Sequence, residues 1–283
     1  MSSVAPAGAE QIVALETGVS LHYVERGAGT PVVFVHGGGK DYHYWDGQLA
    51  AFGARYRTIA YSRRYSPPND NANFAREYNA LVDSSDLVAL LRALSVGPAH
   101  FVAGSIGAVA ALFVAVRHPR LVRSLVVAEP PLMHWARDIP AAAPLFERFS
   151  HDAFLPAGEL FRQGQPERAM ALLINAFVGV GAFERFPDAL KRKVMRGAGD
   201  WGAQATSTVA FPELTRDEVR RVTVPVLMLS GGKTIPVHAL LDDELERVLP
   251  RVERRTIAAA SHDVWADSPD SCRTATLEFL AKH

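Results

Sequence analysis

Phe101-Val102-Ala103-Gly104-Ser105-Ile106-Gly107 is the stretch that decides the fold of this chain. It joins an apolar run at 100–103, typical of a buried strand, to a helical pattern at 106–117 that stops before Pro119. A sharp strand-to-helix turn exposes the residue at its tip and requires small residues two positions before and after it, here Ala103 and Gly107. We therefore predict an exposed, nucleophilic Ser105 at a helix N-terminus that favours negative charge. The alternative is a Gly/Ser-rich turn before an ordinary helix.

The segments on either side alternate between strand-like and helix-like patterns. Short β-prone runs lie at 11–15, 21–25, 32–35 and 58–61, and a helical pattern follows at 81–94. A strand is predicted at 122–128, and later a strand at 225–230, a helix at 237–248, a strand at 252–258 and a helix at 269–281. This alternation predicts an α/β fold with a mostly parallel, doubly wound sheet.

The middle of the chain follows a different pattern. Residues 132–219 are helix-prone, contain no convincing strand, and are interrupted by prolines at 140, 144, 156, 166 and 187. We predict that they form an inserted helical cap (the cap segment) on a core built from 1–131 and 220–283. The cap segment is expected to cover the carboxyl edge of the sheet and to supply most of the apolar side chains of a substrate pocket.

A glycine-rich loop follows the predicted strand at 32–35 and reads His36-Gly37-Gly38-Gly39. Glycines permit the backbone turn that leaves a main-chain N–H free to face a substrate oxygen. We predict an oxyanion hole formed by the N–H groups of Gly38 and Ile106. The alternative is a phosphate-binding loop, but both the dinucleotide fingerprint and the lysine-serine or lysine-threonine ending of a P-loop are missing.

Ala260-Ser261-His262-Asp263 forms a loop after the last predicted strand. A serine hydroxyl is a poor nucleophile without an adjacent base, and His262 comes late in the chain, at the carboxyl end of a strand. We predict that His262 is this base. The alternative is a solvated surface histidine.

These segments resemble the α/β-hydrolase superfamily over nearly the whole chain outside the cap segment. The stretch from Ser105 through Arg117-His118-Pro119 to the strand at 122–127 is similar to the elbow, helix and next strand of lipases, esterases and dehalogenases. The run from 224 to 231, VPVLMLSG, is similar to the strand that normally precedes the catalytic acid. The resemblance implies the α/β-hydrolase fold and a serine–histidine–acid triad.

The sequence departs from the superfamily pattern at the usual position of the acid. An aspartate is expected a few residues after Gly231, but the chain reads Gly231-Gly232-Lys233-Thr234. Thr234 carries no charge, so we expect its replacement to change little. The side chain of Asp263 is expected to point away from the adjacent imidazole, and those of Asp242 and Asp243 to be solvated.

Glu129 is the better candidate for the acid, because it ends the strand at 122–128 at the same sheet edge as Ser105. This placement resembles some haloalkane dehalogenases, lipases and the zearalenone lactonases, which take their acid after that earlier strand. The lactonases also have a glutamate closely followed by proline. A buried carboxylate without a partner is costly, so Glu129 must be paired. The alternative to a triad role is a salt bridge to a cap arginine such as Arg137.

Aromatic residues near the predicted mouth either line an apolar pocket or pack the cap segment onto the core. These candidates for the substrate pocket are Trp45, His134, Trp135, Trp201 and Trp265.

Arg63 and Arg64 lie in the loop after the strand at 58–61. They either bind an anionic group of a substrate or form structural ion pairs, and the second alternative is favoured.

The composition narrows the class of function further. Basic and acidic residues number 30 each, so the formal net charge is zero and nothing favours a nucleic-acid partner. The single cysteine, Cys272, rules out an intrachain disulfide. Residues 1–6 lack a basic region followed by an apolar one, and no apolar run could span a bilayer, so we expect a cytoplasmic protein without membrane partners.

Together these patterns predict a serine hydrolase that cleaves a small-molecule carboxylic ester or lactone through an acyl-enzyme, without metal or cofactor. Cofactor-free perhydrolysis and carbon–carbon bond hydrolysis on the same triad remain alternatives, as does a non-catalytic receptor or scaffold with this fold. The sequence does not indicate the oligomeric state.

Overall fold

The computed structural model describes residues 8–71 and 76–283. The expectation about a signal peptide concerns residues 1–6, which lie outside the described ranges. The described residues contain an eight-stranded sheet in the order β1-β2-β4-β3-β5-β6-β7-β8. Its strands are β1 (Gln11–Ala14), β2 (Ser20–Arg26), β3 (Pro31–Val35), β4 (Arg57–Tyr61), β5 (Ala99–Gly104), β6 (Val122–Ala128), β7 (Val226–Gly231) and β8 (Val252–Ile257). β2 pairs antiparallel with β1 and β4, and the remaining pairs are parallel.

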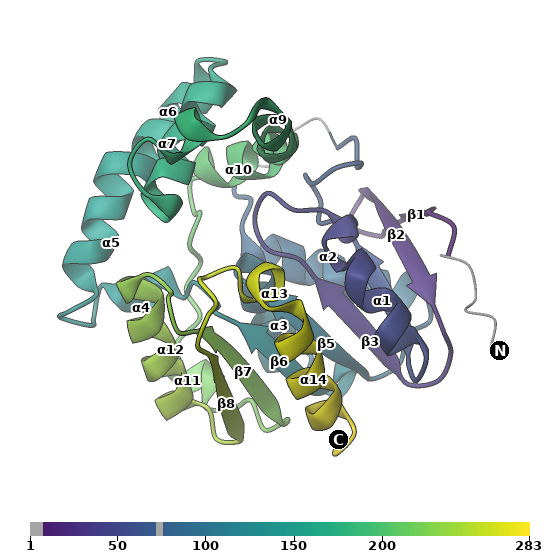
Figure 1. The fold of residues 1–283 in the computed structure, drawn as a ribbon. Coiled ribbons are helices and arrows are strands. Elements are labelled where there is room, and N and C mark those ends of the chain that lie inside the picture. The colour runs from purple at the N-terminus through teal and green to yellow at the C-terminus, as the bar shows by residue number, and fades with distance from the viewer. Residues whose placement is uncertain (1–7, 72–75) are drawn as a thin grey trace.

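Helices cover both faces of this sheet (Figure 1). One face packs against α2 (Ala80–Ala93), α3 (Ile106–Arg117) and α12 (Pro236–Val248). The other packs against α1 (Asp46–Gly53), α13 (Val264–Asp267) and α14 (Pro269–Leu280). Successive residues of a strand point to opposite faces, so Val33 of β3 joins the first apolar core and Phe34 the second. The structure is thus the doubly wound α/β arrangement that the sequence predicts, and the short 3₁₀ helices are η1 (Tyr42–Trp45) and η2 (Pro119–Leu121).

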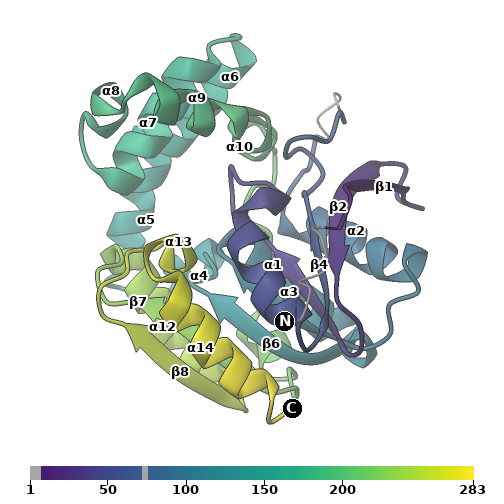
Figure 2. The ribbon, with the colours of Figure 1, turned by 45° about the vertical axis from the view of Figure 1, so that its right-hand side comes forward.

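The chain between β6 and β7 contains helices and no strand. They are α4 (Met133–Ala136), α5 (Ala143–Phe149), the π-helix η3 (Ser150–Phe154), α6 (Leu155–Arg162), α7 (Pro166–Val178), α8 (Ala182–Arg185), α9 (Asp188–Arg196), α10 (Ala198–Ala205) and α11 (Arg216–Val219). Figures 1 and 2 show α6, α7, α9 and α10 gathered at one end of the sheet, apart from the helices on its faces.

Several prolines of the cap segment start its helices instead of breaking them. Pro144, Pro156 and Pro166 lie in the first turn of α5, α6 and α7, and Pro187 caps the start of α9. Proline suits the first turn because its missing N–H would have no partner there and its fixed φ is already helical. The proline positions therefore mark where the cap helices begin.

Candidate active site

Ser105 occupies the turn between β5 and α3 in a strained backbone conformation, with φ +51° and ψ −129°. Its N–H donates to the carbonyl of Ala128 at 2.8 Å, which ties the turn to the end of β6. A Cβ on Gly107 would lie 2.4 Å from the carbonyl oxygen of His36, so only glycine fits two positions after the serine. A strained residue held by such close packing is typical of a functional turn.

The side chains of Ser105, His262 and Glu129 form a continuous line of contacts. His262, in the loop between β8 and α13, places Nε2 3.0 Å from Ser105 Oγ. Its Nδ1 lies 2.7 Å from Glu129 Oε2. Glu129 directly follows β6 and has a φ of +43°, rare for a residue other than glycine. The contact that the sequence predicts between Glu129 and the nitrogen of His262 facing away from Ser105 is present.

The carboxylate of Glu129 is 1% exposed and is held by three neighbours. The N–H of Gly231 donates to Oε1 at 2.6 Å, and the hydroxyl of Thr234 donates to Oε2 at 2.5 Å, alongside His262. Among the described residues no arginine pairs with Glu129, and Arg137 instead lies over the ring of Phe146. The expectation that Thr234 is dispensable does not fit this geometry, because its hydroxyl binds the carboxylate directly.

The other carboxylates considered from the sequence turn elsewhere. Asp263 points away from the imidazole and pairs with Lys40 at 2.6 Å. Asp243 pairs with Arg254 at 2.6 Å. Asp242 is not solvated, as the sequence analysis expected, but 1% exposed, and burial raises its pKa to about 7.

His238 of α12 is a neighbour of the site that the sequence analysis did not identify. Its ring stacks on that of His262 with centroids 4.1 Å apart. It is buried, and neither ring nitrogen has a hydrogen-bond partner among the described residues. Burial, followed by the nearby His262, holds the pKa of His238 well below its usual value, so the ring is neutral.

One group of potential metal ligands occurs within the described ranges. Single ligand atoms of Glu129, His238 and His262 lie within 4.8 Å of one another. The carboxylate of Glu129 and both nitrogens of His262 already form the contacts described above. A metal ion at this position would have to displace those contacts.

The glycine-rich loop lies beside the serine, as the sequence predicts for an oxyanion hole. A Cβ built on Gly37 would be 3.0 Å from the Cβ of Ser105. Within the described part of the chain, the N–H groups of Gly38 and Ile106 donate to no backbone carbonyl. The oxyanion hole formed by these two donors stays a prediction.

The aromatic pocket candidates of the cap segment differ in their surroundings. Trp201 of α10 covers the loop, since a Cβ on Gly38 would be 3.0 Å from its ring. His134 and Trp135 line a small cavity together with Ile106. Trp135 is nevertheless 1% exposed in the core, and its Nε1 donates to the carbonyl of Leu214 at 2.6 Å, so this ring packs the cap segment onto the core.

The assignment of Trp45 and Trp265 to the pocket is corrected by the structure. Trp45 is 0% exposed in the core under α1, where it packs edge-on against Trp265 at 5.2 Å. The 3₁₀ turn η1 and the short helix α13 direct both rings into the sheet face and away from the pocket.

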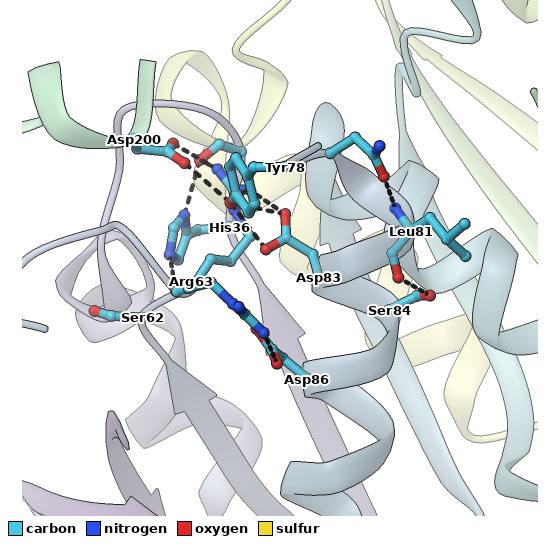
Figure 3. Close-up of polar contacts among 12 residues, drawn as sticks. His36, Ser62, Arg63, Tyr78, Leu81, Asp83, Ser84, Asp86 and Asp200 are labelled. Atoms are coloured by element: carbon cyan, nitrogen blue, oxygen red, sulfur yellow. Dashed lines mark hydrogen bonds and ion pairs between the residues drawn. The ribbon is translucent and has the colours of Figure 1, made fainter. Parts of the chain in front are cut away.

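Arg63 and Arg64 form structural ion pairs, and those of Arg63 are shown in Figure 3. The side chain of Arg63 is 0% exposed and lies 2.5 Å from both Asp83 and Asp200. Arg64 pairs with Asp86 at 2.7 Å. Neither guanidinium is available to a substrate anion.

Residues 30–269 match the family model described as alpha/beta hydrolase fold. The chain therefore belongs to the α/β-hydrolase family, a family of hydrolases. None of the helices within residues 8–71 and 76–283 has both the length and the apolar character needed to cross a bilayer.

Two relatives share parts of their length with this chain. YraK, an uncharacterized hydrolase of Bacillus subtilis, is 34% identical over 119 residues, which are 41% of this chain and 43% of YraK. Bifunctional epoxide hydrolase 2 of Sus scrofa is 22% identical over 312 residues, covering 95% of this chain and 54% of that protein. The chain thus matches about half the length of each.

Among solved structures, the enol-lactonase from Burkholderia xenovorans LB400 superposes with a TM-score of 0.75 at 18% identity. The superposition covers 96% of this chain and 100% of the enol-lactonase. At this identity the likeness concerns the fold.

Proposed function

We propose that this protein hydrolyses a small-molecule carboxylic ester or lactone through an acyl-enzyme. The observation that carries the proposal is the line of contacts Ser105–His262–Glu129, with distances of 3.0 and 2.7 Å. A nucleophile, a base within hydrogen-bond reach and a carboxylate on the far side of that base are the parts that acyl transfer requires. The name of the Burkholderia neighbour, an enol-lactonase, agrees with this chemistry.

In the first half of the reaction, Ser105 Oγ attacks the substrate carbonyl carbon while its proton passes to His262 Nε2. The carbonyl oxygen becomes an oxyanion that accepts hydrogen bonds from the N–H groups of Gly38 and Ile106. Glu129 keeps the other proton on Nδ1 and stabilises the imidazolium. When the intermediate collapses, the bond to the leaving oxygen breaks and that oxygen takes the proton from Nε2.

In the second half, water attacks the acyl carbon of the ester on Ser105 and gives a proton to His262 Nε2. The second tetrahedral intermediate releases the carboxylic acid, and the proton returns to Ser105 Oγ. With a lactone, the leaving alcohol stays tethered to the acyl group, so the product is a single hydroxy acid.

The proposal is tested by fluorophosphonate labelling and by a panel of p-nitrophenyl esters and lactones, with Ser105→Ala as the blank. We expect the parent protein to label and to hydrolyse members of the panel, and Ser105→Ala to do neither while its thermal unfolding is unchanged. Failure of the parent protein to label indicates a non-catalytic receptor or scaffold. Hydrolysis retained in Ser105→Ala refutes the mechanism.

A further inference from the structure

The two peptide groups that flank Gly38 are both held by one buried ion pair. Nη2 of Arg63 donates to the carbonyl of Gly37 at 3.4 Å, and the N–H of Gly39 donates to Asp200 Oδ2 at 2.8 Å. Nη2 and Oδ2 of this pair are 2.5 Å apart. Gly38, the proposed oxyanion donor, therefore lies between two peptide groups of fixed orientation.

The direction of the Gly38 N–H follows from the carbonyl that shares its peptide group. The backbone N–H of Arg63 donates to Nε2 of His36 at 3.0 Å, so the proton of this imidazole is on Nδ1 and is donated to the Gly37 carbonyl at 2.8 Å. Burial, followed by the charge of Arg63, holds the pKa of His36 well below its usual value and keeps it neutral. In a trans peptide the C=O and N–H point in opposite directions, so the Gly38 N–H points away from His36 and Arg63.

The carboxylate of this ion pair comes from the cap segment, where Asp200 lies in the first turn of α10. A Cβ on Gly197, just before this helix, would lie 2.5 Å from the Cα of Gly39. Gly39 has a φ of +68°, and a Cβ on it would be 2.6 Å from Nε1 of Trp201. The start of α10 thus packs directly onto the loop backbone, with no space for a side chain between them.

The rest of the network holds the guanidinium in place (Figure 3). Nη1 of Arg63 donates to Asp83 at 2.5 Å, and the hydroxyl of Tyr78 contacts Asp83 at 2.9 Å and Asp200 at 3.3 Å. All four side chains are buried. The desolvation of buried ion pairs offsets much of their attraction, so stability alone accounts poorly for this network, whereas a requirement for defined geometry accounts for it.

We propose that Asp200 and Arg63 are positioning residues for the oxyanion hole. Through the Gly39 N–H and the Gly37 carbonyl they fix the direction of the Gly38 N–H, so the docking of α10 sets the geometry of the hole. This inference rests on the proposed function, in which Gly38 stabilises the oxyanion.

The test compares the fluorophosphonate labelling rate, kcat and KM of four variants with those of the parent protein. Asp200→Ala is expected to lower kcat and the labelling rate about 10- to 100-fold and to leave KM within about twofold of the parent. This loss in kcat is smaller than the ~10²–10³-fold loss caused by removing an oxyanion donor outright. Arg63→Lys keeps the charge but not the forked geometry and is expected to lose about tenfold.

Asp200→Asn separates positioning from a general loss of stability. Its amide oxygen can accept from both Gly39 and Arg63, and its NH₂ can donate to the Tyr78 hydroxyl, so we expect rates within about threefold of the parent. Arg64→Met is the matched control. It removes a neighbouring ion pair that does not reach the loop, so thermal stability should fall while the labelling rate stays unchanged.

The inference is overturned if Asp200→Ala and Arg63→Lys label at the parent rate, if Asp200→Asn loses as much as Asp200→Ala, or if Arg64→Met loses as much as either. Thermal unfolding of each variant shows that the folded protein is being assayed. A parent protein that neither labels nor hydrolyses esters refutes the proposed function, and this inference with it. A parent that does both leaves the variant rates to decide on Asp200 and Arg63 alone.

Discussion

Replacing Glu129 by glutamine preserves the shape of the side chain and reverses one hydrogen bond at the centre of the site. The carboxylate receives Gly231 N–H on Oε1 at 2.6 Å, and Thr234 Oγ1 and His262 Nδ1 on Oε2 at 2.5 and 2.7 Å. An amide has one oxygen and one NH₂. Because a backbone N–H can only donate, the amide oxygen takes the position facing Gly231, and the NH₂ faces His262.

An NH₂ that faces Nδ1 donates to it, so the neutral imidazole of His262 in Glu129→Gln carries its proton on Nε2. That nitrogen lies 3.0 Å from Ser105 Oγ and can no longer take the serine proton. The corresponding change in a serine–histidine–aspartate triad lowers kcat about 10⁴-fold, equivalent to ~5 kcal/mol of transition-state stabilisation. We expect a loss of this size in kcat, with KM changed little.

The assay is steady-state hydrolysis of a p-nitrophenyl ester, with Asp263→Asn as the matched control. Asp263 is adjacent to His262 in sequence, but its carboxylate pairs with Lys40, so its amide should retain kcat within a few-fold. A Glu129→Gln variant with kcat within about tenfold of the parent would refute the reasoning. So would an equal loss in Asp263→Asn.

Two further changes follow from neighbouring contacts. Thr234→Val removes one of the three donors to Glu129 and should lower kcat about tenfold, because a hydrogen bond to a charged group is worth ~1.5–3 kcal/mol and two donors remain. Thr234→Ser keeps the hydroxyl and should restore kcat, whereas a valine variant with the kcat of the parent would contradict the role of this contact. Burial raises the pKa of Asp242 to about 7, so its contribution to stability is complete below about pH 4 and is lost as pH rises through 7. The free energy of unfolding, measured in urea between pH 4 and 8, should therefore include a decline on the order of 4 kcal/mol that is absent in Asp242→Asn. Parallel pH curves for the two proteins would exclude this role of Asp242.

The strands and the serine turn could be predicted because their signals are local. Each parallel strand is a short apolar run bounded by turn residues, and the limits on side-chain size around Ser105 lie within five consecutive positions. The contact of Glu129 with His262 could also be predicted, because the sequence has a glutamate after β6 and no aspartate in the few residues that follow Gly231.

The helical spacing around Asp242 indicates that this side chain is buried, contrary to the expectation that it is solvated. His238, Leu241, Asp242 and Leu245 follow the i, i+3, i+4, i+7 spacing of one helix face, and all four are buried in α12. The leucines mark this face as the one that packs on the sheet, so the aspartate on it is carried into the core. Judging Asp242 by its charge instead of its position in the helix led to the expectation of a solvated side chain.

The contact between Arg63 and Asp200 had no comparable signal. The two residues are 137 positions apart, and Asp200 reaches Arg63 only because the cap segment folds back over the end of β3. Helical periodicity identifies the cap helices but not the direction in which α10 docks. The sequence therefore allowed two alternatives for Arg63, and the burial of both partners decides between them.

The environment of Glu129 explains how a carboxylate can be buried there without an arginine. Removing a carboxylate from water costs several kcal/mol, and the sequence analysis therefore required that Glu129 be paired. Three hydrogen bonds to the charged group, each worth ~1.5–3 kcal/mol, offset a penalty of that size without a cation. Two of them come from the end of β7 and the loop that follows it: the N–H of Gly231 and the hydroxyl of Thr234. In this chain the residues at the end of β7 and just after it therefore hold the carboxylate of Glu129 in place.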